Sequence, residues 1–179
     1  MSKIANRVIS IPQNVKIFLD GGIFSAQGPL GKSKELIIPK EVEIVQEDDK
    51  IITNSLINSA LAGTFNSLIN NSIKGVVDGY KDIVEVKGIG YKVSLKDGKL
   101  EFSLGKSHLN YVSIPKDLKV KVESNKITVE GVDKQSVTIF SSNKIRPLRK
   151  PSVYKKSKGI YFLGEDETIK IKPGKSLNK

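Results

Sequence analysis

The tripeptide Gly-Lys-Ser occurs three times in this 179-residue chain, and it is the triplet that ends a phosphate-cradling P-loop. Such a loop also needs a glycine five residues before the one that precedes the lysine. Those three positions hold Ala26, Leu100 and Ile169. None of the triplets lies between a predicted buried parallel strand and a helix. We therefore interpret all three as loops and predict no nucleotide hydrolysis.

Other side chains that could do chemistry are few and scattered. His108 is the only histidine, and the chain has no cysteine, so thiolate metal sites, disulfides and cysteine nucleophiles are excluded. The acidic runs at residues 47–49 and 165–167 read as solvated turns, because adjacent carboxylates repel one another without a cation. A general base would need a nucleophile and an orienting partner, and a lone histidine has neither. We predict a protein that is not an enzyme and has no metal and no cofactor.

Gly88-Ile89-Gly90 begins like a dinucleotide-binding fingerprint, but Val93 stands where the third glycine should be. Glycine inside a strand pattern commonly marks a bend or a bulge. The alternative is that these glycines let the backbone of another molecule approach closely. Both interpretations remain open at this point.

Positive charge is the most informative property of the composition. The net charge is +11 and the isoelectric point is about 9.7. Residues 143–179 contain eleven Lys or Arg and three acidic residues, so most of the excess is concentrated in the last fifth of the chain. A clustered excess of this kind attracts polyanions. The alternative is that abundant lysine only keeps the protein soluble.

The segment IRPLRKPSVYKKSKGIYF, residues 145–162, combines Lys and Arg with two prolines and two tyrosines and contains no acidic residue. Arg146, Arg149 and Lys150 follow a predicted helix, and the prolines are expected to keep the backbone extended. An extended, stiff segment loses less entropy on binding than a flexible one. Arginine can grip phosphate oxygens with two hydrogen bonds, and lysine neutralises them as a point charge. The pattern predicts a phosphate-binding surface.

Folded RNA fits this surface better than single strands or membranes do. Aromatic residues make up only 6% of the chain, too few for a platform that stacks successive bases. The deep major groove of RNA hides its base edges, so recognition by shape and phosphate suits it. A membrane-adsorbing segment would need a basic amphipathic helix, which the prolines disfavour. The chain has neither a run of about 18 apolar residues nor the features of a signal peptide, so we expect an intracellular protein without a membrane partner.

Two stretches of the chain align without a gap at an offset of 103 residues. They are PQNVKIFLDGGIFSAQG, residues 12–28, and PKDLKVKVESNKITVEG, residues 115–131. Pro12, Lys16 and Gly28 recur in the second stretch, and the apolar positions agree. Each stretch alternates apolar residues on both sides of a turn, as a β-hairpin does. The repeat indicates an internally duplicated module.

A helical pattern follows each hairpin. In the first half, Ile57, Leu61, Phe65 and Leu68 are spaced as one buried face of an amphipathic helix. In the second half, a helix is expected to begin after Asp133, to end near Pro147 and to bury the four residues Val137, Phe140, Ser141 and Ile145.

Between the two halves, alternating apolar residues flank Asp97-Gly98, which is the strongest hairpin signal in the chain. The predicted fold class is α+β, with two tandem related domains at residues 1–81 and 82–179. Each domain is expected to be an antiparallel sheet packed against a helix.

With these residues in view, the chain resembles the bacterial family of large-subunit ribosomal protein L six over nearly its whole length. VKGIGYKVSLKDGKLEFSLGKSH resembles the family's glycine-tyrosine hairpin and the Ser-His stretch after it. The C-terminal signature of the family is matched by Gly131, Asp133, Lys134, Gln135, Ile145, Arg146, Arg149, Pro151, Tyr154, Lys155, Lys158 and Gly159. The chain departs from the family in a basic loop one residue longer and in Tyr161, where an arginine is common.

The resemblance implies a structural protein that binds large-subunit rRNA near the stalk base and the sarcin–ricin region, beside neighbouring ribosomal proteins and without a small-molecule substrate. It implies a place in the cytoplasmic ribosome and a role in assembly and translation. The rRNA-binding residues we expect are Arg146, Arg149, Lys150, Tyr154, Lys155, Lys156, Lys158, Lys170, Lys172 and Lys175. A weaker second patch comprises Lys87, Gly88, Gly90, Tyr91, Lys92 and Lys134. A free nucleic-acid-binding module, such as an architectural DNA protein, is the alternative.

Overall fold

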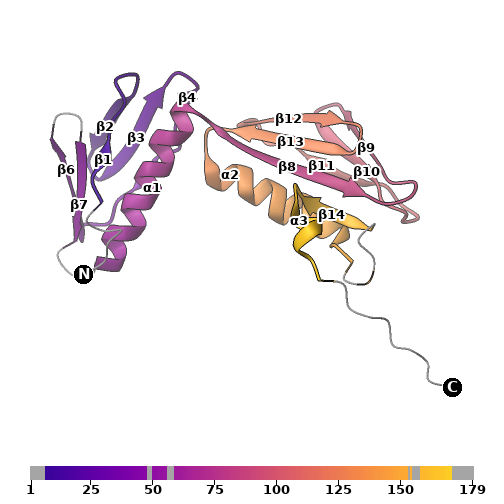
Figure 1. Cartoon of the computed structure of the whole chain (residues 1–179). Helices are drawn as coiled ribbons and strands as arrows, with labels where there is room; N and C mark the ends of the chain where they lie inside the picture. Colours follow the sequence, from indigo (N-terminus) through magenta and orange to yellow (C-terminus); the bar gives the residue numbers. More distant parts are fainter. Residues whose placement is uncertain (1–6, 48–49, 56–58, 153, 155–157, 171–179) are drawn as a thin grey trace. The chain divides into compact units, whose positions relative to one another are not determined.

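The computed structural model describes residues 7–47, 50–55, 59–152, 154 and 158–170, and the chain forms two compact units (Figure 1). The first unit comprises residues 1–80 and 132–134, and the second comprises residues 81–131 and 135–179. All strand pairs with a defined register are antiparallel. The predicted α+β class is confirmed, although each unit contains two small sheets instead of one.

Within its described residues, the first unit combines seven strands with one long helix. One sheet has the strand order β1-β7-β6, and the other has the order β2-β3-β4 with β5 also paired to β3. The elements are β1 (Ile9–Ser10), β2 (Lys16–Asp20), β3 (Ile23–Gly28), β4 (Gly31–Lys32), β5 (Leu36–Ile37), β6 (Val42–Glu47), β7 (Lys50–Ser55) and α1 (Ser59–Val77). Helix α1 contacts β3, β6 and β7, so it packs against both sheets (Figure 1).

The buried face of α1 differs from the predicted one. Leu61, Phe65 and Leu68 are only half-buried, and Ile57 lies outside the described residues. The buried face consists instead of Ala62, Asn66, Ile69, Ile73 and Val76. The prediction was wrong by one position, because the first half of the helix has apolar residues on two adjacent faces and Ile73 and Val76 near its end select between them.

A polar contact lies inside this face. Asn66, which is 2% exposed, donates hydrogen bonds from its side-chain amide to the carbonyl oxygen of Arg7 at 2.7 Å and to the hydroxyl of Thr53 at 3.0 Å. Thr53 in turn donates to the carbonyl oxygen of Ala62 at 3.4 Å. The network ties α1 to β7 and to the start of the described chain. The apolar periodicity used for the prediction carries no signal for it.

The second unit has two sheets of its own, with strand orders β12-β13-β8-β14 and β11-β10-β9. The strands are β8 (Tyr80–Lys87), β9 (Lys92–Lys96), β10 (Lys99–Ser103), β11 (Asn110–Ser113), β12 (Leu118–Glu123), β13 (Lys126–Gly131) and β14 (Gly159–Phe162). The predicted central hairpin is confirmed: Lys96 pairs with Lys99, and Asp97 and Gly98 between them both have positive φ, as a two-residue hairpin turn requires.

The helical segment of the second unit changes type along its length. It begins as α2 (Lys134–Ile139), widens into the π-helix η1 (Phe140–Ile145) and tightens into the 3-10 helix η2 (Arg146–Arg149). All four residues predicted to face inward, Val137, Phe140, Ser141 and Ile145, are buried. Ser141 donates a 2.6 Å hydrogen bond to the carboxylate of Asp82 in β8, which fixes the helical segment to the sheet. Figure 1 shows α2 lying along the four-stranded sheet.

Candidate nucleic-acid interface

The basic segment begins inside a helix, contrary to the expectation of an extended strip. Arg146 to Arg149 form η2, and Pro147 is tolerated because it lies in the first positions of that short helix, where its missing N–H is not needed. The backbone becomes extended only at Lys150, with φ −58° and ψ 147°. The proline at position 147 therefore does not end the helical segment, and the extended part is shorter than predicted.

Arg146 is used inside the protein. Its guanidinium forms an ion pair with the carboxylate of Glu165, and it lies 5.3 Å from the centre of the Phe162 ring. The same carboxylate accepts a 2.9 Å hydrogen bond from the backbone N–H of Phe162. Glu165 opens the short helix α3 (Glu165–Thr168), so Arg146 joins η2 to β14 and α3. The carboxylate of Glu165 largely balances the charge of Arg146, so we propose that this arginine holds the elements beside the basic loop together.

The segment from Lys150 to Lys158, here called the basic loop, is closed at its base by contacts within the protein. The N–H of Ser152 donates to the carbonyl oxygen of Lys158 at 2.9 Å. Gly159 has φ +138°, and a Cβ added there would lie 2.6 Å from the Cα of Pro151, so only glycine allows this approach. Tyr161, 1% exposed, donates its hydroxyl to the Lys158 carbonyl at 3.1 Å.

Cations without an ion-pair partner lie at this base and after α3. At the base, Lys150 and Lys158 are exposed and Arg149 is half-buried, and Lys170 is exposed after α3. None of the four forms an ion pair within the described ranges. Tyr154 is 63% exposed. Lys155, Lys156, Lys172 and Lys175 lie outside the described residues.

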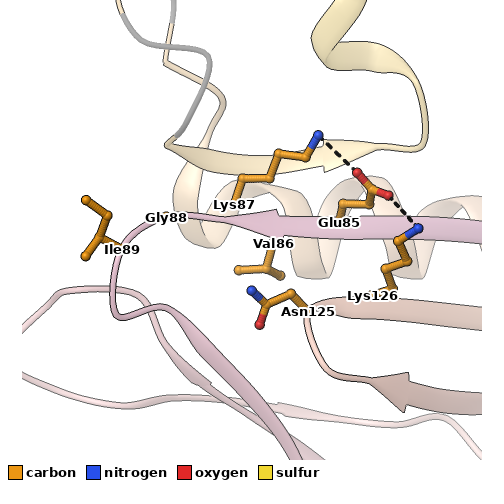
Figure 2. Close-up of a pocket in the computed structure, with 7 residues that line it drawn as sticks. All are labelled: Glu85, Val86, Lys87, Gly88, Ile89, Asn125 and Lys126. Atoms are coloured by element: carbon orange, nitrogen blue, oxygen red, sulfur yellow. Dashed lines mark ion pairs between the residues drawn. The ribbon is translucent and has the colours of Figure 1, made fainter.

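The structure brings Lys87 from the second predicted patch to the basic loop. In the pairing of β8 with β14, Lys87 lies opposite Gly159, and its Nζ atom is 5.9 Å from the centre of the Tyr161 ring. Figure 2 shows Lys87 and Lys126 both reaching toward Glu85, with N–O distances of 3.1 and 3.2 Å. Lys126 was not among the predicted residues. The one sequence signal for it is its place directly after Ser124-Asn125, the turn of a predicted hairpin, where a lysine is expected to be exposed.

Among the described groups of this patch, the carboxyl of Glu85 is the one whose pKa is clearly shifted. Burial of its carboxyl opposes ionisation, but hydrogen bonds and charge interactions from Lys87 and Lys126 outweigh it and lower the pKa of Glu85 below its ordinary value. The carboxylate therefore stays ionised between the two lysines and orients both ammonium groups. Their net charge remains positive, which suits a phosphate placed beside them.

The remaining residues of the second patch are dispersed. Tyr91 is buried at 7% exposure, and a Cβ at Gly88 would lie 2.4 Å from its ring, so this tyrosine supports the loop from inside and presents no surface for stacking. Gly90 is exposed and has φ +76°, a turn conformation. Lys92 lies on the sheet of β9, β10 and β11.

Lys134, the first residue of α2, is grouped with the first unit. Its Nζ lies 5.7 Å from the centre of the Tyr80 ring. Burial, followed by the negative charges of Asp78 and Asp133, raises the pKa of the Tyr80 hydroxyl. The lysine therefore has a local partner in an aromatic ring.

Two other kinds of site are relevant to the described residues. These residues contain no group of three or more potential metal ligands and no helix long and apolar enough to span a membrane. His108 is exposed in a loop. In the first Gly-Lys-Ser triplet, Lys32 pairs with Glu35 at 3.0 Å and Ser33 is buried, accepting a hydrogen bond from the N–H of Ala26 at 2.9 Å. The third triplet lies outside the described residues.

Known proteins match this chain in two ways: a family model matches much of its second unit, and individual relatives match it over its whole length. The family model described as ribosomal protein L6 matches residues 87–161, which include the Gly-Ile-Gly loop, α2 and the basic loop. Large ribosomal subunit protein uL6 of Hydrogenobaculum sp. (strain Y04AAS1) is 43% identical, with 100% of this chain and 98% of the relative covered. The uL6 proteins of Mycoplasmopsis pulmonis, at 40% identity with both chains fully covered, and of Thermosipho africanus, at 37% with 98% and 99% covered, are similar to it as well. On this full-length similarity, the chain belongs to the uL6 family of ribosomal proteins.

Proposed function

We propose that the chain binds folded large-subunit rRNA through the basic loop and the cations around its base. Membership of the uL6 family makes it a structural constituent of the large ribosomal subunit in the cytoplasm and not an enzyme. The proposal of binding through the basic loop is supported by two observations. Three cations without an ion-pair partner in the described residues lie at the loop, namely Arg149, Lys150 and Lys158. The base of the loop is fixed by contacts of Ser152, Gly159 and Tyr161.

The fixed base gives the loop its advantage as a phosphate-binding element. A loop base that is fixed before binding reduces the ordering entropy lost when the loop meets RNA. Lys87 and Lys126 extend the cationic surface along β8 and β13, and Glu85 holds both in place. If about six phosphates are neutralised, the logarithm of the binding constant falls with the logarithm of salt concentration with a slope of about −4 to −5.

The decisive experiment removes the unbalanced charges and measures incorporation into large subunits. We expect the triple variant Arg149→Gln/Lys150→Gln/Lys158→Gln to bind rRNA with a salt slope smaller in magnitude by about 2 to 3, and to be depleted from sedimenting particles. The matched control is Lys16→Gln/Lys34→Gln/Lys50→Gln, which removes the same charge from exposed positions of the first unit. Equal incorporation of the two triple variants would refute a role for the basic loop.

The site on the rRNA is part of the proposal. From the family resemblance, the contacted RNA lies near the stalk base and the sarcin–ricin region, beside other ribosomal proteins, and the contact supports assembly and translation. The chain contains no cysteine, so Tyr154→Cys provides a single attachment point for a tethered iron chelate. Hydroxyl radicals from this position should cleave the rRNA in the sarcin–ricin region. Cleavage confined to other rRNA domains would contradict the location while leaving rRNA binding intact.

A further inference from the structure

The sheet of β9, β10 and β11 has two unlike faces. One face is largely apolar, with Leu100, Phe102 and Val112 buried. The strand registers place a second set of residues together on the opposite face: Lys92, Ser94, Lys96, Lys99, Glu101, Ser103, Tyr111 and Ser113. Three of these are lysines, one is acidic and the rest are serine or tyrosine. This outer face is therefore basic and polar, with a single aromatic ring.

Tyr111 is that ring, and it is open to solvent. Its side chain is 62% exposed, and it lies across from Glu101 in the pairing of β11 with β10. Together with Lys96, Asp97 and Lys99, these two residues line a shallow depression of the surface. An exposed tyrosine that is ringed by charged side chains contributes nothing to the packing of the core, so its ring is available to a partner.

The charges around the ring are not equivalent. Glu101 has a side chain only 13% exposed, and its carboxylate is balanced by Lys96 at 2.8 Å and accepts a hydrogen bond from the hydroxyl of Ser94 at 3.5 Å. Lys99 and Lys92 are exposed and make no ion pair with any residue that the structure describes. The acid is thus satisfied within the protein, while two ammonium groups remain for an anion.

We propose that this face binds one unpaired nucleotide of rRNA, with its base stacked on the ring of Tyr111 and an adjacent phosphate bound by Lys99. The partner is argued from charge complementarity. Glu101 is paired with Lys96, Asp97 of the adjacent turn is the one further acid at the depression, and the exposed Lys92 and Lys99 leave the strand face basic. Such a face suits a polyanion and lacks the apolar core of a protein interface. A single aromatic ring can stack one base, in contrast to a platform for successive bases. The inference rests on the proposed function, since it takes rRNA as the partner.

The first test uses purified large subunits that contain the unaltered protein. Ultraviolet irradiation followed by mass spectrometry should identify a peptide containing Tyr111 that is joined to a nucleotide. The second test measures the flexibility of each rRNA nucleotide by 2′-hydroxyl acylation. Tyr111→Ala should raise the reactivity of one or two unpaired nucleotides by about fivefold, Tyr111→Phe should leave it unchanged because the ring is kept, and Lys99→Gln should give a smaller rise.

The outcomes separate this inference from the proposed function. Incorporation of the Tyr111→Ala protein should be normal, because the basic loop is intact and the side chain is on the surface. An unchanged acylation pattern in such particles, or a crosslink from Tyr111 to another protein, would overturn the inference and leave rRNA binding by the basic loop untouched. Failure of the proposed function would appear instead as normal incorporation of the triple glutamine variant of the basic loop.

Discussion

The hairpin of β2 and β3 and the hairpin of β12 and β13 have the same register, but the helices that follow them differ. Lys16 pairs with Gln27 in the first, and Lys119 pairs with Glu130 in the second, at the same offset of 103 residues. After the first hairpin, α1 is regular over 19 residues. After the second, α2 is only six residues long before it becomes a π-helix and then a 3-10 helix.

The difference lies at the end of each helical segment. In the first unit the helix only covers the sheets, and Lys74 is the one basic residue of its last turn. In the second unit the change of helix type ends in Arg146 and Arg149, directly before the basic loop. The shared register supports a duplication, and the altered helix end adds the cationic surface to one copy. Three predictions test how far the correspondence extends.

The largest effect is expected at the glycine that ends each hairpin. A Cβ at Gly28 would lie 2.8 Å from the carbonyl oxygen and 2.9 Å from the Cγ2 of Val76 in α1. A Cβ at Gly131 would instead meet the ends of two side chains, Leu118 at 2.7 Å and Val137 at 2.9 Å. A backbone oxygen cannot turn away, whereas side chains can. We expect Gly28→Ala to lower the free energy of unfolding by about 3 kcal/mol and Gly131→Ala by about 1 kcal/mol.

Urea unfolding followed by circular dichroism measures both losses, and hydrogen exchange of peptides from α1 and α2 assigns each loss to its unit. A larger loss for Gly131→Ala than for Gly28→Ala would mean that the second hairpin is packed against its helix at least as rigidly as the first. In that case the altered helix type would not have loosened the contact.

A medium effect is expected at the buried polar residue of each helical segment. Asn66→Leu removes two donated hydrogen bonds and leaves the Arg7 carbonyl and the Thr53 hydroxyl without that donor, at an expected cost of about 2 to 3 kcal/mol. Ser141→Ala removes one bond to Asp82, whose half-buried carboxylate can take up water instead, so we expect about 1 kcal/mol.

Thr64→Ala is the control for this pair, because Thr64 is exposed on α1 and its hydroxyl donates to the carbonyl oxygen of Ala60 at 3.0 Å. Its replacement should change the free energy of unfolding by less than about 0.5 kcal/mol. A loss for Ser141→Ala equal to that for Asn66→Leu would indicate that the bond to Asp82 is as important to the second unit as the amide network is to the first.

Sequence reasoning was most reliable where local chemistry decides the structure. Asp97-Gly98 is a two-residue turn because both residues accept positive φ, and the buried face of the second helical segment follows from four apolar or small residues with polar neighbours. These signals lie within a few residues of one another. The antiparallel sheets and the α+β class follow from such local patterns.

The errors concern contacts between residues far apart in the chain. The face of α1 depends on which of two apolar stripes the sheets accept, and periodicity gives both. Arg146, which is predicted to bind rRNA, also pairs with Glu165 nineteen residues later, a partner that no local pattern indicates. Tyr91, which is predicted in the second patch, is buried, with its ring against Gly88 and Gly105. In the candidate interface, the sequence identified the basic loop but not Lys126, Glu85 or the bracing of the loop base by Tyr161.

The smallest effect is expected from the ion pairs, and it is best seen as a dependence on pH. The pKa of Glu85 is lower in the folded chain than its ordinary value of 4.5, so the folded state holds the ionised form more strongly than the unfolded state does. The resulting stability is fully present above pH 4.5 and is lost as the pH falls through the lower folded value. The free energy of unfolding of Glu85→Gln should therefore be lower than that of the unaltered protein above pH 4.5, and the difference should shrink as the pH falls below 4.5.

The matched control comes from the first unit, where Lys32 and Glu35 form a pair with both side chains more than half exposed. An exposed pair contributes about 0.5 kcal/mol or less, so Glu35→Gln should leave the stability of the chain nearly unchanged at neutral pH. Urea unfolding between pH 3 and 7 makes the comparison. If the Glu85→Gln variant and the unaltered protein lose stability in parallel over this range, the two lysines do not hold the carboxylate as argued. Lys87 and Lys126 would then approach RNA as independent charges, and the proposed extension of the interface along β8 would lose its fixed geometry.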